Sequence, residues 1–457
     1  MIRPRVMNVS TDLAMPPCDY QPPVYDGPTR EQVAALRKQY VHPSLFALYK
    51  EPIMLVDGYM QWLFDEKGGR YLDMIAGIVT VSCGHRHPKV SGAIAEQLRH
   101  LQHATTIYLH PNLPLLAEKV ASKLPDGLDV TYFVNSGSEA NELAINMARV
   151  FTGNTDVVAL RNGYHGMSSM SMGLTSHHTW KPNIPQGSRV HHTMNPDPYR
   201  NAFSGTPEEI ATQSAEQLRE LLRFSTPGQV AAFIAEPIQG VGGSSHGAAS
   251  YFTEAYDIIR DHGGLCISDE VQTGFGRTGD HYWGFQHANV KPDIVVMAKG
   301  IGNGVPLAAV TTTREIAEAF TSRLHFNTYG GNPVSMAAGL AVIDVIDEEG
   351  LQENCRVVGN RLKAGLTALM DRHELIGDVR GMGLMLGVEL VTDRGTKEPA
   401  KAETATVLEE CREHGMLIGK GGLYGNVLRI KPPMCITEED ADFAIDVLDA
   451  ALEVARN

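Results

Sequence analysis

A lysine that ends an apolar segment is the first residue here whose type and position suit covalent chemistry. The segment 294–304 reads IVVMAKGIGNG, so Lys299 follows a run typical of a buried strand. Partial burial lowers the pKa of a lysine amine and makes it a nucleophile toward carbonyl carbons. A strand-end lysine that points into solvent is the alternative. Gly300, Gly302 and Gly304 favour the first interpretation, because glycine lets a ligand approach the backbone closely.

A carboxylate ends the preceding apolar segment, LCISD. Asp269 can cap a turn, or it can hold a protonated pyridine nitrogen so that the ring withdraws electrons from a neighbouring bond. A pyridoxal phosphate enzyme requires a lysine and an aspartate of this kind. Their places at the ends of consecutive predicted strands therefore indicate pyridoxal 5′-phosphate as the cofactor.

A short Gly/Ser turn offers a place for the cofactor's phosphate. The run VTYFV leads into Asn135, Ser136, Gly137 and Ser138, and a helical pattern begins at once. Helix N-termini bind phosphate through free N–H groups and the positive end of the helix dipole. Ser136 and Glu139 also fit an S-x-x-E capping box, and both interpretations can hold together. The sequence has no G-x-x-x-x-G-K-[ST] loop, which disfavours a nucleoside triphosphatase.

Further candidates follow other apolar runs. Tyr164 and His165 come after DVVAL, and Tyr164 can provide the aromatic surface that a planar ring needs. Glu236 follows a predicted strand in AEPIQG, and Arg429 in VLRIKPP can pair bidentately with a substrate carboxylate. A tyrosine that packs a loop and an arginine in a surface ion pair are the alternatives. The histidines lack the spacing of a zinc site, so no metal is expected.

The elements that carry these residues alternate along the chain from about residue 115. Helical patterns such as LLAEKVASKL and EANELAINMARVF separate short apolar runs, among them VTYFV, DVVAL, VAAFIAEP, GLCISDE and DIVVMAK. This alternation predicts an α/β fold whose mostly parallel sheet is covered by helices on both faces. Ligands of such sheets bind outside the carboxyl ends of the strands, where the candidate residues lie.

The sequence divides into three expected parts. Residues 1–75 are an N-terminal arm, proline-rich and extended, followed by part of a smaller domain that begins with a hairpin over 60–74. Residues 76–340 are the large cofactor-binding domain, with a helix over 89–101, and residues 341–457 are a C-terminal small domain of mixed helices and strands. A long amphipathic helix over 335–349 crosses the last boundary.

Composition excludes several classes of partner. The 457 residues carry a net charge of −14, from 39 Lys+Arg and 53 Asp+Glu, which disfavours nucleic acid and anionic membranes. Six cysteines without a Cys-x-x-Cys pair are typical of a reducing compartment. No apolar run is long enough to span a bilayer, and the first ten residues lack the apolar core of a signal peptide.

With these motifs assembled, the chain resembles the class III, omega-type aminotransferases of fold type I. The resembling motifs follow the family's order over nearly the whole chain: NSGSEANELA (135–144), RNGYHG (161–166), AEPIQG (235–240), SDEVQTGFGRTG (268–279), MAKGIGNG (297–304), FNTYGGNP (326–333) and GDVRGMGLMLGVEL (377–390). Within the family, IVTVSCGHRHPKV (78–90) and PPMCIT (432–437) resemble the alanine–glyoxylate aminotransferases of the mitochondrial, second type.

The resemblance implies a role for each matching position. Lys299 would hold the cofactor as a Schiff base and move protons, while Asp269 would pair with the pyridine nitrogen. The remaining implied cofactor residues are Ser136, Gly137 and Ser138 at the phosphate, Thr328 at the phosphate of the neighbouring subunit, Tyr164 and Val271 on the two ring faces, Gln272 near the ring hydroxyl, and His165 and Glu236 beside them. Arg429 would bind the substrate carboxylate.

The activity that the resemblance implies is transfer of an amino group from alanine or a small omega-amino acid, such as β-alanine or 3-aminoisobutyrate, to glyoxylate or pyruvate. A homodimer with shared active sites is expected, in a bacterial cytoplasm or, as the alternative, in mitochondria. An ornithine or 4-aminobutyrate aminotransferase, an aminomutase and a decarboxylase share the cofactor residues and stay open. A non-catalytic relative is disfavoured, because every cofactor position is filled.

Overall fold

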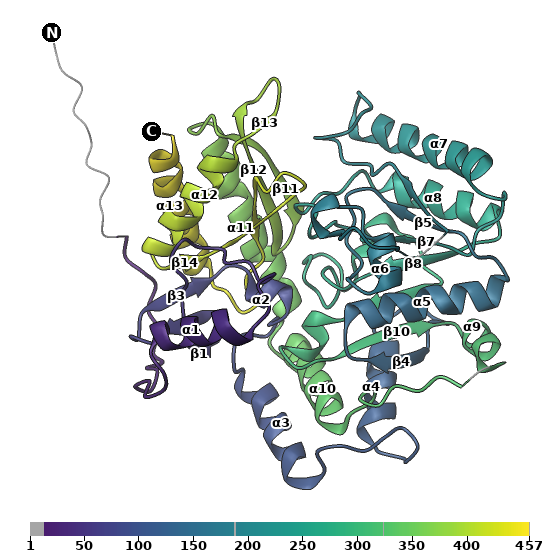
Figure 1. Ribbon diagram of the computed structural model, residues 1–457, viewed down its shortest axis with the longest axis horizontal. Coiled ribbons are helices and arrows are strands. Elements are labelled where there is room, and N and C mark those ends of the chain that lie inside the picture. The colour runs from purple at the N-terminus through teal and green to yellow at the C-terminus, as the bar shows by residue number, and fades with distance from the viewer. Residues whose placement is uncertain (1–12, 187–188, 323, 457) are drawn as a thin grey trace.

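The computed structural model describes residues 13–186, 189–322 and 324–456, and its larger half is built on a seven-stranded sheet (Figure 1). The strands lie in the order β4-β10-β9-β8-β7-β5-β6. All neighbours from β9 to β6 are parallel, while β10 runs antiparallel to both β4 and β9. The predicted mostly parallel sheet is confirmed, and the direction of β10 is the exception to it. The strands are β4 (Val130–Val134), β5 (Val157–Leu160), β6 (Val190–Thr193), β7 (Ala232–Ala235), β8 (Leu265–Asp269), β9 (Ile294–Met297) and β10 (Ala308–Thr312).

Helices cover both faces of this sheet, as the continuous apolar strands predict. On one face, α5 (Gly137–Thr152) shares a core with Ile294 and Val296 of β9. On the other face, Val295 and Met297 join a core with α4 (Asn112–Ala121) and α10 (Pro333–Glu348). Farther along that face, α7 (Pro207–Ser225) and α8 (Ser250–Asp261) pack over β5, β7 and β8. Successive strand residues point to opposite faces, so burial on both sides requires an unbroken apolar run such as IVVM.

The smaller half joins the two ends of the described chain (Figure 1). The hairpin of β2 (Trp62–Asp65) and β3 (Arg70–Asp73) is the one predicted over 60–74, and β3 pairs in parallel with β14 (Met416–Leu417). A second sheet has the order β11-β12-β16-β15, with β13 beside β12. Residues of the 55–73 region therefore lie beside residues of the C-terminal third. The exact domain limits stay a prediction.

Two helices whose limits the sequence predicts agree with the structure within two residues. The helix predicted over 89–101 is α3 (Pro88–His100), and the one predicted over 335–349 is α10. Residues 13–28 of the arm contain no helix or strand, and residues 1–12 lie outside the described residues. The other elements are α1 (Arg30–Tyr40), β1 (Leu55–Tyr59), α2 (Ala76–Val79), α6 (Ser169–Leu174), α9 (Arg314–Ala319), α11 (Leu351–Met370), β11 (Ile376–Met382), β12 (Met385–Asp393), β13 (Glu398–Pro399), α12 (Lys401–Glu413), β15 (Gly419–Gly421), β16 (Val427–Ile430) and α13 (Glu438–Ala455).

The turn α2 has a left-handed backbone conformation that the sequence does not predict. All four of its residues have positive φ, from 51° at Ala76 to 66° at Ile78. Left-handed helical turns cost about 1–2 kcal/mol per non-glycine residue, so neighbouring contacts must hold this one. The buried carboxylate of Asp73 does so by accepting hydrogen bonds from the N–H groups of Ile75 and Ala76. Within the described residues, no helix combines the length and apolarity that crossing a bilayer requires.

Candidate functional site

A cavity of about 190 Å³ opens at the carboxyl ends of the central strands and collects most of the predicted site residues. We call it the cofactor cavity. Its walls contain residues that follow β4, β5, β7, β8 and β9, which is where ligands of parallel sheets bind. The lining residues are Ser136, Gly137, Ser138, Asn141, Tyr164, His165, Gly166, Glu236, Asp269, Val271, Gln272 and Lys299. Two predicted site residues, Thr328 and Arg429, are not among them.

Asp269, the last residue of β8, is a buried carboxylate held from three sides. Its Oδ2 accepts hydrogen bonds from Asn141 Nδ2 at 2.9 Å and from His165 Nδ1 at 2.8 Å, while its Oδ1 accepts from the N–H of Val271 at 3.1 Å. Burial lowers the pKa of His165, but the hydrogen bond and charge of Asp269 outweigh it and raise that pKa overall. Oδ1 keeps acceptor capacity for one more donor. The arrangement suits a protonated ring nitrogen.

Lys299 begins a tight turn directly after β9. It lies two residues beyond Met297 and has a φ of 49°, a left-handed conformation that few non-glycine residues adopt. Burial lowers the pKa of its amine to about 8, against the opposing charges of Asp269 and Glu236. With that pKa, about a tenth of the amine is neutral at pH 7, far more than for a lysine of ordinary pKa, and this neutral form can attack a carbonyl carbon. The solvent-facing alternative is wrong, because the side chain lines the cofactor cavity.

Gly300 and Gly302 do not make room for a ligand, and the sequence interpretation is wrong at these two positions. A Cβ on Gly300 would lie 2.7 Å from Ser82 Oγ, and one on Gly302 would lie 3.2 Å from Leu307 Cβ. Gly304 has a φ of 102°, which requires glycine for backbone reasons. The protein itself fills the space beside Gly300 and Gly302, whereas a Cβ on Gly304 would have no neighbour within 4 Å.

The first turn of α5 offers N–H groups to the cavity. Gly137 and Ser138 are its first two residues, and N–H groups at that position have no intrahelical acceptor. A Cβ on Gly137 would lie 3.3 Å from Val271 Cγ2, so a side chain there would fill the space between the helix end and Val271. Gly137 and Ser138 also line the cofactor cavity, so the free N–H groups of this helix end are placed where a phosphate could bind. The residues present therefore fit the expected cofactor at its phosphate end, its ring nitrogen and its carbonyl end.

The predicted capping box at this helix is half correct. Ser136 caps the helix by accepting a hydrogen bond from the N–H of Glu139 at 3.3 Å. The Glu139 carboxylate does not return the bond to Ser136, because it accepts from the N–H of Asn135 at 2.7 Å. The cap thus extends one residue further back, toward the end of β4.

Glu236 and Tyr164 form the wall beside these groups. Glu236 is buried, and its oxygens accept from the N–H of Tyr164 at 2.9 Å and the N–H of Gly240 at 2.8 Å. Burial raises the pKa of Glu236, while the positive charge of His165 opposes this rise. The Tyr164 ring meets Trp180 edge-on, with 5.4 Å between centroids. These contacts fix the tyrosine ring at the cavity wall.

Arg429 lies on β16, outside the cofactor cavity but close enough to Glu236 for their charges to interact. Burial lowers its pKa to about 10, and Glu236 offsets part of that change. Its Nε and Nη2 groups are buried without a hydrogen-bond partner within the described chain. Buried unpaired donors are costly, which fits a site that receives a carboxylate from a ligand. The surface ion pair considered from the sequence is wrong, because Arg429 is buried.

Thr328 is exposed and does not reach the cavity of its own chain. Its neighbour Asn327 accepts a hydrogen bond from Asn135 Nδ2 at 2.9 Å, so this segment lies beside the end of β4. A contact of Thr328 with the phosphate of a second subunit stays a prediction.

The sequence interpretation missed Asn141 and Lys431. Asn141 is a buried amide inside α5 that donates to both Asp269 and the carbonyl of His165. Lys431 is a buried amine that donates to Gln272 Oε1. Each has a weak sequence signal: a polar residue within an apolar helix stretch, and a lysine two positions after Arg429 on the same predicted strand.

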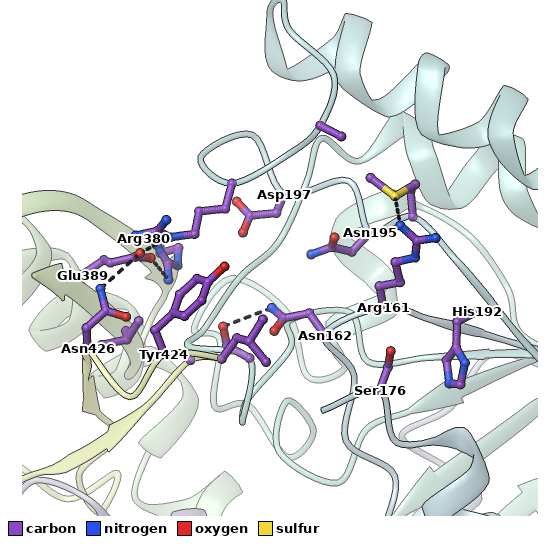
Figure 2. A pocket seen from close by; sticks show the side chains of 17 residues that line it. Arg161, Asn162, Ser176, His192, Asn195, Asp197, Arg380, Glu389, Tyr424 and Asn426 are labelled. Atoms are coloured by element: carbon purple, nitrogen blue, oxygen red, sulfur yellow. Dashed lines mark hydrogen bonds and ion pairs between the residues drawn. The ribbon is translucent and has the colours of Figure 1, made fainter. Parts of the chain in front are cut away.

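A second cavity, of about 380 Å³, lies where the two halves of the molecule meet (Figure 2). We call it the junction cavity. Three of its charged residues form one network, in which Glu389 accepts from Arg200 and, at 2.7 Å, from Arg380 Nη2, while Arg380 Nη1 also donates to Asp378 at 2.7 Å. Arg161 and Asp197 also line the cavity and take part in no ion pair recorded among the described residues. Figure 2 shows the Arg380–Glu389 cluster on one side of the cavity and Arg161 on the other. None of the predicted site residues lines it.

Comparison with known proteins gives a consistent family. The model of the family described as aminotransferase class III matches residues 49–452. A protein of Arabidopsis thaliana, named alanine–glyoxylate aminotransferase 2 homolog 2, mitochondrial, is 53% identical over 438 residues, which cover 96% of this chain and 91% of that protein.

Solved structures that are similar in both fold and sequence support the same family. A phospholyase from Arthrobacter in complex with phosphoethanolamine superposes with a TM-score of 0.87 at 35% identity, covering 92% of this chain and 99% of that one. An amine transaminase from an uncultivated Pseudomonas species, in its pyridoxal-phosphate-bound form, gives 0.85 at 32% identity, with 91% and 99% covered. The chain therefore belongs to the class III aminotransferases, enzymes that depend on pyridoxal 5′-phosphate.

Proposed function

We propose that this aminotransferase moves the amino group of alanine, or of a small omega-amino acid such as β-alanine or 3-aminoisobutyrate, to glyoxylate or pyruvate. The observation that carries the proposal is the 53% identity, over 96% of the chain, to a relative named for alanine and glyoxylate. The buried, unpaired N–H groups of Arg429 support it, because each of these substrates has a carboxylate for them to bind.

The cofactor cavity has a separate holder for each end of the cofactor. Gly137 and Ser138 would offer backbone N–H groups to the phosphate, and Asp269 would hold the ring nitrogen. The side chains of Tyr164 and Val271 would lie against the ring. When bound, pyridoxal phosphate supplies an electron-withdrawing ring beside the bond that breaks at the substrate Cα. Asp269 keeps that ring protonated, because its own carboxylate is fixed by Asn141, His165 and the chain at Val271.

Lys299 has two roles in this proposal. Its Nζ would hold the cofactor, and when free it would take up and return the proton of the substrate Cα. A base with a pKa near the working pH serves this exchange in both directions, and burial places the pKa of Lys299 at about 8. In two half-reactions, the donor would leave as an oxo acid before the acceptor binds, and its amino group would pass to the acceptor by way of the cofactor.

A matrix of amino donors against oxo acceptors tests the proposal. The holoenzyme is assayed with alanine, β-alanine, 3-aminoisobutyrate, ornithine and 4-aminobutyrate, each with glyoxylate, pyruvate and 2-oxoglutarate. We expect the highest kcat/KM for one of the first three donors with glyoxylate or pyruvate. A preference for ornithine or 4-aminobutyrate would replace our substrate assignment with that of another aminotransferase.

Other reactions on the same scaffold give different products. Release of carbon dioxide would indicate a decarboxylase, and isomerisation without an acceptor would indicate an aminomutase. The similarity to a phospholyase adds one more arm, in which phosphoethanolamine is supplied without an oxo acid and inorganic phosphate is measured. Phosphate release faster than any amino transfer would contradict the proposed activity.

We also propose that two copies of the chain form the working enzyme. Helix α1 has no buried residue, and Ile107, Tyr108 and Phe326 are exposed apolar side chains near the Thr328 segment. Light scattering after size exclusion should give twice the mass of one chain. Thr328→Ala should weaken cofactor binding although Thr328 lies outside its own cavity. A monomer with full activity would contradict this proposal.

The compartment is a smaller part of the proposal. All six cysteines are free, which suits a reducing compartment such as a bacterial cytoplasm. The Arabidopsis relative is named as mitochondrial, and that is the alternative for this chain. Fractionation of source cells, followed by immunodetection, distinguishes the two compartments.

A further inference from the structure

Lys431 is a fully buried lysine that the proposed chemistry does not use. It follows β16, has 0% of its surface exposed and does not line the cofactor cavity. Its Nζ donates to two neutral acceptors, the carbonyl of Gly240 at 3.1 Å and Gln272 Oε1 at 3.2 Å. Buried lysines are rare unless a carboxylate pairs with them. A buried lysine that has only neutral acceptors is therefore a candidate for a functional role of its N–H donors.

The charges around Lys431 disfavour a cation there. Arg429 is two residues earlier, on the same face of the strand, and Lys299 and Arg277 add further positive charge. Glu236 is the one acid that acts in the opposite direction. Burial, followed by Arg429, lowers the pKa of Lys431 well below its ordinary value. Strongly perturbed groups beside a ligand cavity are candidates for functional roles.

The hydrogen bond from Lys431 to Oε1 gives the orientation that the Gln272 amide has in this structure. An amide has an acceptor end and a donor end, and the partners of one end fix the other. Because Lys431 donates to Oε1, the N–H₂ group is the end that is free for another partner. Gln272 is 5% exposed and lines the cofactor cavity. A Cβ on Gly240 would lie 2.3 Å from Gln272 Cδ, so this glycine packs closely against the amide.

The same lysine connects Gln272 to the acid on the neighbouring strand end. Glu236 accepts from the N–H of Gly240, and the carbonyl of Gly240 accepts from Lys431. Glu236, Gly240, Lys431 and Gln272 thus form one chain of contacts along the cavity wall. Removing Lys431 would release Gln272 and the 236–240 segment from each other.

We propose that Lys431 is a positioning residue that holds Gln272 with its amide N–H₂ group toward the cofactor cavity, where it donates to the ionised ring oxygen of pyridoxal phosphate. The inference rests on the proposed role of Gln272 near that oxygen. Without Lys431, the amide can turn and present Oε1, which favours the protonated ring oxygen. Lys431 therefore stabilises the anionic form of the ring oxygen through Gln272, without touching the cofactor.

The test is a pH titration of the visible absorbance of the holoenzyme. Lys431→Met has nearly the same shape without donors, and Lys431→Gln keeps a shorter donor. Lys420→Met is the matched control, since Lys420 is an exposed lysine on the neighbouring β15. Gln272→Leu and the Lys431→Met/Gln272→Leu double variant complete the set. Circular dichroism and melting temperature show which variants fold.

Lys431→Met should raise the pH midpoint of the absorbance change by about one to two units, the span expected when a hydrogen bond to a charged oxygen is lost. Lys431→Gln should give a smaller shift, and Lys420→Met none. In the Gln272→Leu background, Lys431→Met should add no shift, because Gln272 carries the effect.

Two results would overturn the inference. An unchanged midpoint in folded Lys431→Met would show that the lysine does not act on the cofactor. An equal shift with and without Gln272 would show that it acts by charge alone. If Lys431→Met does not fold, unchanged titration of folded Lys431→Gln and Gln272→Leu would be equally decisive. Failure of the wild-type protein to bind pyridoxal phosphate would instead contradict the proposed function itself.

Discussion

The cofactor cavity and the junction cavity both have charged side chains in or near their walls, but they differ in how these side chains are paired within the protein. In the junction cavity, Glu389 binds both Arg200 and Arg380, so the network is neutralised within the protein (Figure 2). Near the cofactor cavity, Lys299 takes part in no ion pair recorded among the described residues, and Arg429 keeps buried N–H groups without acceptors. Buried cationic groups that lack an acceptor therefore occur near the smaller cavity, although the junction cavity has twice its volume.

The difference shows that charge balance identifies a chemical site better than size does. Burying an ionisable group shifts its pKa unless a partner compensates, and the protein tolerates such a cost where a ligand supplies the partner. A paired network has no such need, and it serves to join two parts of the chain. The comparison predicts that substitutions in the cofactor cavity change catalysis, whereas those in the junction cavity change stability.

Lys299→Ala is the strongest test of the difference between the two cavities. The variant loses both the covalent anchor and the proton carrier, so turnover should fall by at least the roughly 100- to 10,000-fold that acid–base catalysis supplies. Its melting temperature should stay close to that of the wild type. Arg161→Ala, on the wall of the junction cavity, is the matched control and should keep its turnover. Substantial transamination by Lys299→Ala would refute the assignment.

Glu389→Gln should have the opposite effect, because it should lower the stability of the protein and leave its turnover unchanged. Glu389 is 2% exposed, and neutralising it leaves Arg200 and Arg380 without their shared counter-charge. Removing one partner of a buried ion pair costs about 3–5 kcal/mol, so the free energy of unfolding should fall by roughly that amount. Chemical denaturation of the holoenzyme measures it, with Glu353→Gln, from an exposed ion pair, as control. A loss of turnover without a loss of stability would contradict a purely structural junction.

The sequence predicts the cofactor cavity better than the junction cavity for a physical reason. Lys299, Asp269 and Glu236 each follow an apolar run, and parallel strands bring such ends to one edge of the sheet. A local pattern is enough to place them together. Glu389 and Arg200 are in contact only because two segments far apart in the sequence pack together, and no local sequence pattern predicts that contact.

The same reasoning explains the residues that were missed or misread. Asn141 and Lys431 act through hydrogen bonds to residues far away in the chain, so their types alone suggest little. Gly300 and Gly302 were assigned to a ligand because the sequence cannot show that Ser82 and Leu307 fill the space beside them. Contacts between distant segments decide these cases.

Asp269→Asn tests the cofactor cavity further, and its expected loss in free energy is smaller than that of either variant above. The amide keeps the shape of the carboxylate but loses the charge that holds a protonated ring nitrogen. Hydrogen bonds to charged groups contribute about 1.5–3 kcal/mol, so the apoenzyme should bind pyridoxal phosphate about 10- to 150-fold more weakly. Fluorescence quenching of the apoenzyme gives the Kd. Affinity equal to that of the wild type would remove Asp269 from the cofactor site.

The pH dependence of cofactor reloading should give the smallest and most specific effect. Burial lowers the pKa of Lys299 to about 8, so the neutral, reactive amine accumulates as pH rises through 8. The rate at which the apoenzyme takes up pyridoxal phosphate covalently should therefore rise about tenfold between pH 7 and pH 9 and then level off. A lysine of ordinary pKa would continue to gain rate up to about pH 10. Glu389→Gln should keep the wild-type profile, because its effect is confined to the junction, and a shifted profile there would mean that the two cavities are electrostatically coupled.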